Sequence, residues 1–162
     1  MATDFTFAYG SNMNRSEIRS WLEANGYDSS LVVDATVATL EGYGYVWDYY
    51  SRGRAGGAAN LEPKENSMVW GVLLEFEEVL LKAFDRKEGH PYAYSRGDRR
   101  VAVRRQRDGK NVLAWLYLAT PNKGGRTDVW PTREYKRIII EAAAFWGFPE
   151  DYIEKLKAWP AQ

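Results

Sequence analysis

The sequence predicts an α+β fold whose sheet is mixed but largely antiparallel, curled into a small barrel with flanking helices. Strand-like segments dominate residues 31–119, helical segments are interleaved with them, and the C-terminal part of the chain is helical. Of the 162 residues, 45% are hydrophobic and 27% are charged, a balance typical of a globular protein. The chain contains no internal repeat or low-complexity linker, so residues 1–162 are expected to form a single domain.

The first predicted elements are a strand, a turn and a helix. Residues 5–9 (FTFAY) are apolar and aromatic, which predicts a short buried strand. A Gly-Ser-Asn turn follows, and Asn14 with Glu17 three positions later has the pattern of a helix N-cap. Gly26 is placed to end that helix.

The middle of the chain predicts strands with one helix between them. Residues 30–40 and 42–50 predict two separate strands. Residues 51–63, rich in Gly and Ala, predict a loop that is either a flexible connection or a segment whose backbone approaches a ligand. Residues 68–76 predict a further strand, and the spacing of apolar residues in 77–88 predicts a helix.

The last part of the chain predicts a hairpin and two helices. Strands are expected on both sides of an Asp108-Gly109 turn. An apolar stripe that begins at Tyr135 predicts the clearest helix of the chain, which Gly147 ends. Pro149 is expected at the first position of a second, short helix.

Composition argues against several classes of partner. The chain has 22 basic and 22 acidic residues, so no net charge attracts nucleic acid or an anionic membrane surface. Basic residues crowd positions 86–110 but lack interleaved aromatic residues, which favours solvated strand faces. The apolar run at 112–119 is far shorter than a membrane span, and the first residues do not resemble a signal peptide. We therefore expect a cytoplasmic protein that binds neither nucleic acid nor membrane.

The residue inventory limits the chemistry of any active site. With no cysteine, the chain has no disulfide, thiolate nucleophile or cysteine-ligated metal. Its one histidine, His90, excludes a multi-histidine metal centre, which leaves a site made of carboxylates as the alternative. Acid–base catalysis would depend on Asp, Glu, Lys, Tyr or His90.

Two short segments have suitable chemistry. Where a strand passes into a helix at Gly10, Ser11 and Asn12, unpaired N–H groups converge and can bind a carboxylate or an oxyanion, although an ordinary turn has the same composition. Glu88 stands at a predicted helix C-terminus, where the dipole disfavours its charge, so burial there would raise its pKa. A solvated surface glutamate is the alternative.

A serine hydrolase built from Ser11, His90 and Asp85 is a competing interpretation of the same segments. The chain lacks the Gly-x-Ser-x-Gly sequence that presents the nucleophile in many such enzymes.

Four stretches together resemble the gamma-glutamylcyclotransferase-like family. They are FAYGSNM, MVWGVLLEF, FDRKEGHPYAYSR and REYKRIIIEAAAFWGFPEDYIEKLK, in the order seen in that family. The resemblance runs over residues 5–159, and Tyr-Gly-Ser-Asn paired with a downstream Glu-Gly is its most specific part. Asn12 differs from the residue that glutathione-specific relatives carry at that position.

The resemblance implies a reaction in which the α-amino group of a gamma-glutamyl amide attacks its own γ-carbonyl. The products are 5-oxoproline and a free amino acid or amine, and no cofactor or metal is needed. Glu88 corresponds to the catalytic glutamate of the family. The implied substrate-binding residues are Tyr9, Gly10, Ser11, Asn12, Met13, Tyr94, Tyr117 and Tyr135, with Tyr92 as the alternative to Tyr94. A small gamma-glutamyl compound is the expected partner. A homodimer and a non-catalytic binding module are left open.

Overall fold

The computed structural model describes residues 2–120 and 126–162. The strands are β1 (Thr3–Ala8), β2 (Val32–Ser51), β3 (Gly56–Glu77), β4 (Tyr94–Ser95), β5 (Val101–Arg105), β6 (Asn111–Ala114) and β7 (Leu118–Ala119). The helices are α1 (Arg15–Ala24), α2 (Leu81–Glu88), α3 (Arg133–Phe145) and α4 (Glu150–Lys157). Three short 3₁₀ turns are η1 (Ser11–Met13), η2 (Ser29–Leu31) and η3 (Glu78–Leu80).

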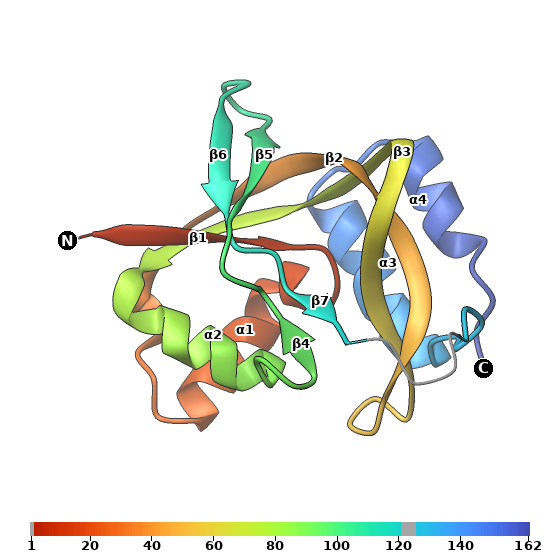
Figure 1. Ribbon diagram of the computed structural model, residues 1–162, viewed down its shortest axis with the longest axis horizontal. Helices are drawn as coiled ribbons and strands as arrows, with labels where there is room; N and C mark the ends of the chain where they lie inside the picture. Colours follow the sequence, from red (N-terminus) through yellow and green to blue (C-terminus); the bar gives the residue numbers. More distant parts are fainter. Residues whose placement is uncertain (1, 121–125) are drawn as a thin grey trace.

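The main sheet has five strands in the order β1-β3-β2-β5-β6, and every neighbouring pair in it is antiparallel. Trp115, just after β6, exchanges backbone hydrogen bonds with Phe5 and Phe7 of β1, so the two ends of the strand order meet. Strands β4 and β7 form a separate two-stranded sheet. The predicted α+β class and largely antiparallel sheet are confirmed (Figure 1).

The prediction of two strands within residues 30–50 is wrong, because the structure has one long strand, β2, of 20 residues. Its pairing with β3 shifts register between Glu41 and Tyr43, and Gly42 between them has a φ of +80°. Glycine reaches this left-handed region without strain, so a bulge forms and both halves stay paired with β3. Gly42 thus bends one continuous strand and does not end it.

The loop predicted for residues 51–63 is also wrong for most of its length, because β3 begins at Gly56 and only a tight turn remains before it. Gly57 donates its N–H to the carbonyl of Trp130 at 3.0 Å. A Cβ on Gly57 would lie 1.7 Å from the carbonyl oxygen of Val129. The glycine therefore permits close packing of two backbones within the folded chain.

The helices largely follow the sequence pattern. Asn14 caps α1 through its side chain, and Gly26 follows that helix with a φ of +83°. Gly89, whose φ is +68°, directly follows the last residue of α2. Pro149 is the N-cap of α4, one residue earlier in the helix than expected.

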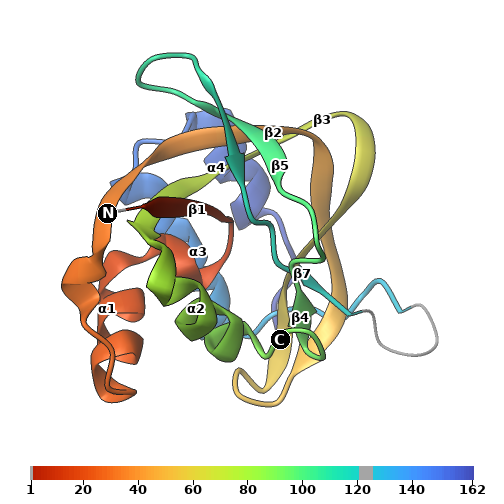
Figure 2. The same cartoon turned by 60° about the vertical axis from the view of Figure 1, so that its left-hand side comes forward.

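The arrangement of these elements brings two segment ends together. Both views place α1 and α2 on the same side of β1 (Figure 1, Figure 2). Strand β1 leads through Tyr9 and Gly10 into η1, while α2 ends at Glu88, and both ends border one cavity. Within the residues described, no helix is long and apolar enough to cross a membrane.

Candidate active site

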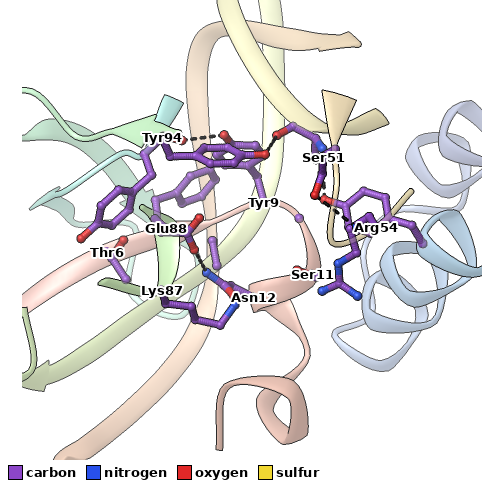
Figure 3. A pocket seen from close by; sticks show the side chains of 16 residues that line it. Thr6, Tyr9, Ser11, Asn12, Ser51, Arg54, Lys87, Glu88 and Tyr94 are labelled. Atoms are coloured by element: carbon purple, nitrogen blue, oxygen red, sulfur yellow. Dashed lines mark hydrogen bonds between the residues drawn. The ribbon is translucent and has the colours of Figure 1, made fainter. Parts of the chain in front are cut away.

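The side chains of Asn12 and Glu88 meet at this junction. The Nδ2 of Asn12 donates a hydrogen bond to Oε1 of Glu88 at 2.5 Å (Figure 3). Asn12 lies in the turn that follows β1, and Glu88 is the last residue of α2. The packing of α2 therefore places a carboxylate beside the turn at residues 10–12, for which the sequence suggests anion binding.

A cavity of about 170 Å³ surrounds this pair. It is smaller than the roughly 300–1,000 Å³ of sites for drug-sized ligands, so it suits a compact metabolite. Every predicted site residue except Met13 lines it, namely Tyr9, Gly10, Ser11, Asn12, Glu88, Tyr94, Tyr117 and Tyr135. Residues from η1, α2, β4 and α3, and from the connections after β1 and β6, are thereby brought together.

Glu88 has the electrostatic character of a general base. Burial raises the pKa of its carboxyl, whereas the charge of Lys87, the hydrogen bond from Asn12 and the charge of Arg54 oppose that rise. The net shift is upward. A carboxyl with a raised pKa accepts a proton more readily near neutral pH, which is what this role requires.

Tyrosine hydroxyl groups fix the walls of the cavity. The hydroxyl of Tyr9 donates to the carbonyl of Tyr117 at 2.6 Å, and that of Tyr94 donates to the carbonyl of Ala59 at 2.8 Å. The N–H of Ala59 in turn donates to the hydroxyl oxygen of Tyr135 at 3.0 Å. Burial raises the pKa of all four tyrosines, that of Tyr135 to about 12, so their hydroxyls stay protonated near neutrality.

Gly10 leaves room for a ligand. A Cβ at this position would lie 3.2 Å from the hydroxyl oxygen of Tyr135 and 3.3 Å from the Cβ of Ala59. A side chain here would therefore crowd the wall of the cavity.

Two neighbouring candidates lie outside the cavity. Met13 is completely buried in the core, and its carbonyl accepts a hydrogen bond from Nε1 of Trp146 at 2.8 Å. Tyr92 is 87% exposed, whereas Tyr94 lines the cavity. Of the two tyrosines that the sequence left open, Tyr94 is the one the structure directs inward.

The residues of the alternative hydrolase are not assembled into a triad. His90 does not line the cavity with Ser11, and its Nδ1 accepts a hydrogen bond from the backbone N–H of Arg96 at 3.3 Å. Asp85 is held by Arg96 through two hydrogen bonds and accepts a third from the hydroxyl of Tyr117. Its carboxylate supports the wall of the cavity and does not orient the imidazole.

Nor do side chains gather into a site for a metal ion. In the part of the chain that the structure describes, no group of three or more His, Asp or Glu residues is placed to ligate one.

Comparison with models of known protein families shows which family this chain belongs to. The model of the AIG2-like family matches residues 68–156, more than half of the chain, including Glu88 and Tyr94. The chain belongs to the AIG2-like family.

Relatives of this AIG2-like protein confirm its resemblance to gamma-glutamylcyclotransferases. The gamma-glutamylcyclotransferase of Mus musculus is 28% identical over 157 residues, which cover 94% of this chain and 76% of that protein. That of Homo sapiens is 32% identical over 104 residues, which cover 64% of this chain and 52% of that protein. A solved gamma-glutamyl cyclotransferase structure has a TM-score of 0.80 at 27% identity and covers 99% of this chain and 90% of its own.

The cavity of the AIG2-like protein also contains residues that were not among the expected site residues. They are Thr6, Phe7, Ala8, Ser51, Arg54, Ala58, Ala59 and Lys87. Lys87 has the clearest signal, because it directly precedes Glu88. Arg54 lies in the turn between β2 and β3, within the Gly-rich stretch for which one interpretation was a close approach to a ligand.

Proposed function

We propose that this protein is a gamma-glutamylcyclotransferase that converts a gamma-glutamyl amide into 5-oxoproline. The observation that carries the proposal is the contact of Asn12 with Glu88 inside a small cavity. The names of its relatives support the same reaction.

Asn12 and Glu88 together provide acceptors for the α-ammonium group of a gamma-glutamyl unit. The Nδ2 of Asn12 donates a hydrogen bond to Glu88. The Oδ1 of Asn12 is buried without a hydrogen-bond partner among the described residues. A buried acceptor without a partner costs roughly 1–3 kcal/mol, so a bound donor is strongly favoured there. An ammonium group between Oδ1 of Asn12 and the Glu88 carboxylate would satisfy both.

In the reaction, Glu88 first takes a proton from the α-ammonium group. The freed amine attacks the γ-carbonyl carbon, and the new C–N bond closes a five-membered lactam. Glu88 then gives that proton to the departing nitrogen as the original amide bond breaks. The attacking nitrogen loses its second proton through Glu88 to the released amine, so the products are a neutral lactam and an ammonium group. Because the nucleophile belongs to the substrate, no protein nucleophile is needed and no water is consumed.

The turn η1 supplies donors for the charge that develops on the substrate oxygen. The N–H groups of Ser11 and Asn12 belong to its first turn and have no partner within it. Removal of one such donor typically lowers a rate by roughly a hundred- to a thousandfold. Gly10 leaves the space that a substrate oxygen needs to approach these groups.

The test is a panel of gamma-glutamyl amino acids, gamma-glutamyl amines and glutathione, with 5-oxoproline as the readout. We expect 5-oxoproline from at least one gamma-glutamyl compound, at a rate that chelators do not change. Saturable binding of gamma-glutamyl compounds without any turnover would instead indicate a binding module. The cytoplasmic location and the homodimer stay predictions.

A further inference from the structure

Two cationic side chains line the cavity beside Asn12 and Glu88. Arg54 comes from the turn between β2 and β3, and Lys87 comes from the last turn of α2. In the view of Figure 3 they extend from opposite sides, with Ser11 and Asn12 between them. The proposed chemistry at Glu88 uses neither of them.

Arg54 is anchored but retains free hydrogen-bonding capacity. Its guanidinium carbon lies 5.1 Å from the ring centre of Tyr135, and its Nη2 lies 3.5 Å from Oε2 of Glu17. That separation exceeds the ~2.7–2.9 Å of a charge-assisted hydrogen bond. Within the described residues, the guanidinium donates no hydrogen bond. Its side chain is 31% exposed, which places it at the rim of the cavity.

Lys87 is a cation of a different kind. It forms no ion pair within 4.0 Å in the described part of the chain, and burial lowers the pKa of its ammonium group. Glu88 is the strongest charged influence on it, and Lys87 in turn is the strongest charged influence on Glu88. Its positive charge therefore acts next to the carboxylate that would receive the substrate α-ammonium group.

The substrate has two positions for a carboxylate, and each position lies near a different one of these cations. The α-carboxylate of a gamma-glutamyl unit is attached to the same carbon as the α-amino group, so it must lie near Glu88 and hence near Lys87. When the departing group is an amino acid, a second carboxylate stands on the far side of the scissile amide. A variable departing group must also extend toward the rim, where Arg54 lies.

Building on the proposed cyclotransferase activity, we propose that Arg54 binds the carboxylate of the departing amino acid. Arg54 thereby makes this protein selective for gamma-glutamyl α-amino acids over gamma-glutamyl alkylamines. The planar guanidinium presents paired N–H groups that match a carboxylate, and it lies over the ring of Tyr135.

The test compares gamma-glutamylalanine with gamma-glutamylethylamine, which differs from it by the loss of the departing carboxylate. We expect Arg54→Gln to lower the ratio of their kcat/KM values by roughly ten- to a hundredfold, the usual range for a lost charged hydrogen bond. Arg54→Lys should restore part of the ratio, because it keeps the charge and loses the planar fork. Arg52→Gln, an exposed residue of the same turn, is the matched control.

An unchanged ratio in Arg54→Gln, or an equal fall in Arg52→Gln, would overturn the assignment. Dissociation constants of the two compounds, measured in a Glu88→Gln background with and without Arg54→Gln, separate this inference from the proposed activity. Absence of 5-oxoproline with the unaltered protein would refute the activity. Selective weakening of gamma-glutamylalanine binding by Arg54→Gln would still support the subsite, and equal weakening of both compounds would refute it.

Discussion

The carboxamide of Asn12 donates a hydrogen bond to the carboxylate of Glu88, although 76 positions separate the two residues. One comes from the turn that ends β1 and the other from the last residue of α2. Neither element forms the site without the other, because the carboxylate of Glu88 and the N–H donors of Ser11 and Asn12 lie on different elements. The following expectations depend on this junction and on the residues that support it.

Replacement of Glu88 by Gln should abolish catalysis while the protein stays folded. We expect kcat/KM to fall by roughly a hundred- to ten-thousandfold, the usual contribution of a general acid–base group. Burial raises the pKa of Glu88, so its charged form destabilises the fold near neutral pH and the neutral amide should not lower the melting temperature. Assay of 5-oxoproline together with thermal unfolding checks both parts. Full activity in Glu88→Gln would remove Glu88 from its proposed role.

The pH profile of kcat/KM should respond to Lys87. The proposed role of Glu88 requires its ionised form, so the rate should rise with pH through a pKa above the usual 4.5 of a glutamate. The positive charge of Lys87 holds this pKa down, so Lys87→Met should move the rising limb to higher pH. Lys82→Met, on the exposed side of the same helix, is the control. A rising limb that stays in place in Lys87→Met would contradict this coupling.

Substitution of Gly10 by Ala should impair binding through its volume. The added Cβ meets the hydroxyl of Tyr135 and the Cβ of Ala59, at the surface that a substrate must contact. We expect kcat/KM to fall roughly ten- to a hundredfold, as expected for a displaced reactant, with the fold retained. Gly44→Ala in β2 meets only the flexible side chain of Lys64 and is the control. Equal activity of the two variants would show that the space at Gly10 is not needed.

Tyr9 should contribute to stability through its hydroxyl. Tyr9→Phe removes the hydrogen bond to the carbonyl of Tyr117 and leaves that carbonyl without this donor. We expect the free energy of unfolding to fall by about 1–2 kcal/mol in urea titrations. Tyr50→Phe, at a residue that is 48% exposed, should change it by much less. Indistinguishable midpoints for the two variants would argue against a structural role of the Tyr9 hydroxyl.

Asp85 should make stability fall at acid pH. Burial raises the pKa of Asp85, but the hydrogen bonds from Arg96 and Tyr117 outweigh it and hold this pKa below 3.8. A lowered folded-state pKa adds stability above the unfolded value and loses it as the pH falls through the folded value. Asp85→Asn should therefore cost about 1–3 kcal/mol near neutrality. Its melting temperature should approach that of the unaltered protein in acid, and parallel curves would contradict this account.

The sequence predicts the local elements of this fold well where a short-range signal decides them. Asn14 accepts from two first-turn N–H groups, and Gly26 and Gly89 adopt left-handed conformations after their helices, as their positions indicate. The pairing of the Gly10–Asn12 turn with Glu88 also follows from residue types together with the family resemblance. Residues adjacent in the sequence, or a recognisable motif, are sufficient to predict these features.

Features that depend on distant packing could not be predicted in the same way. The long β2 and the early start of β3 depend on strand pairing and on the approach of Gly57 to Val129, which no local pattern records. Met13 adjoins the predicted turn in sequence, yet the 3₁₀ geometry directs it into the core. Arg54 reaches the cavity only because the β2–β3 turn folds over Tyr135.

Tyr9 is fastened at two points, since its hydroxyl binds the carbonyl of Tyr117 and its own carbonyl accepts a hydrogen bond from the hydroxyl of Tyr45. A glutamyl unit has few atoms with which to offset the entropy lost when a mobile segment becomes ordered. With the entrance to the turn already rigid before any ligand arrives, that loss is incurred during folding and is not repeated in each turnover. The contacts of even a weakly bound metabolite can then stabilise the transition state, because none of their binding energy is needed to order the turn.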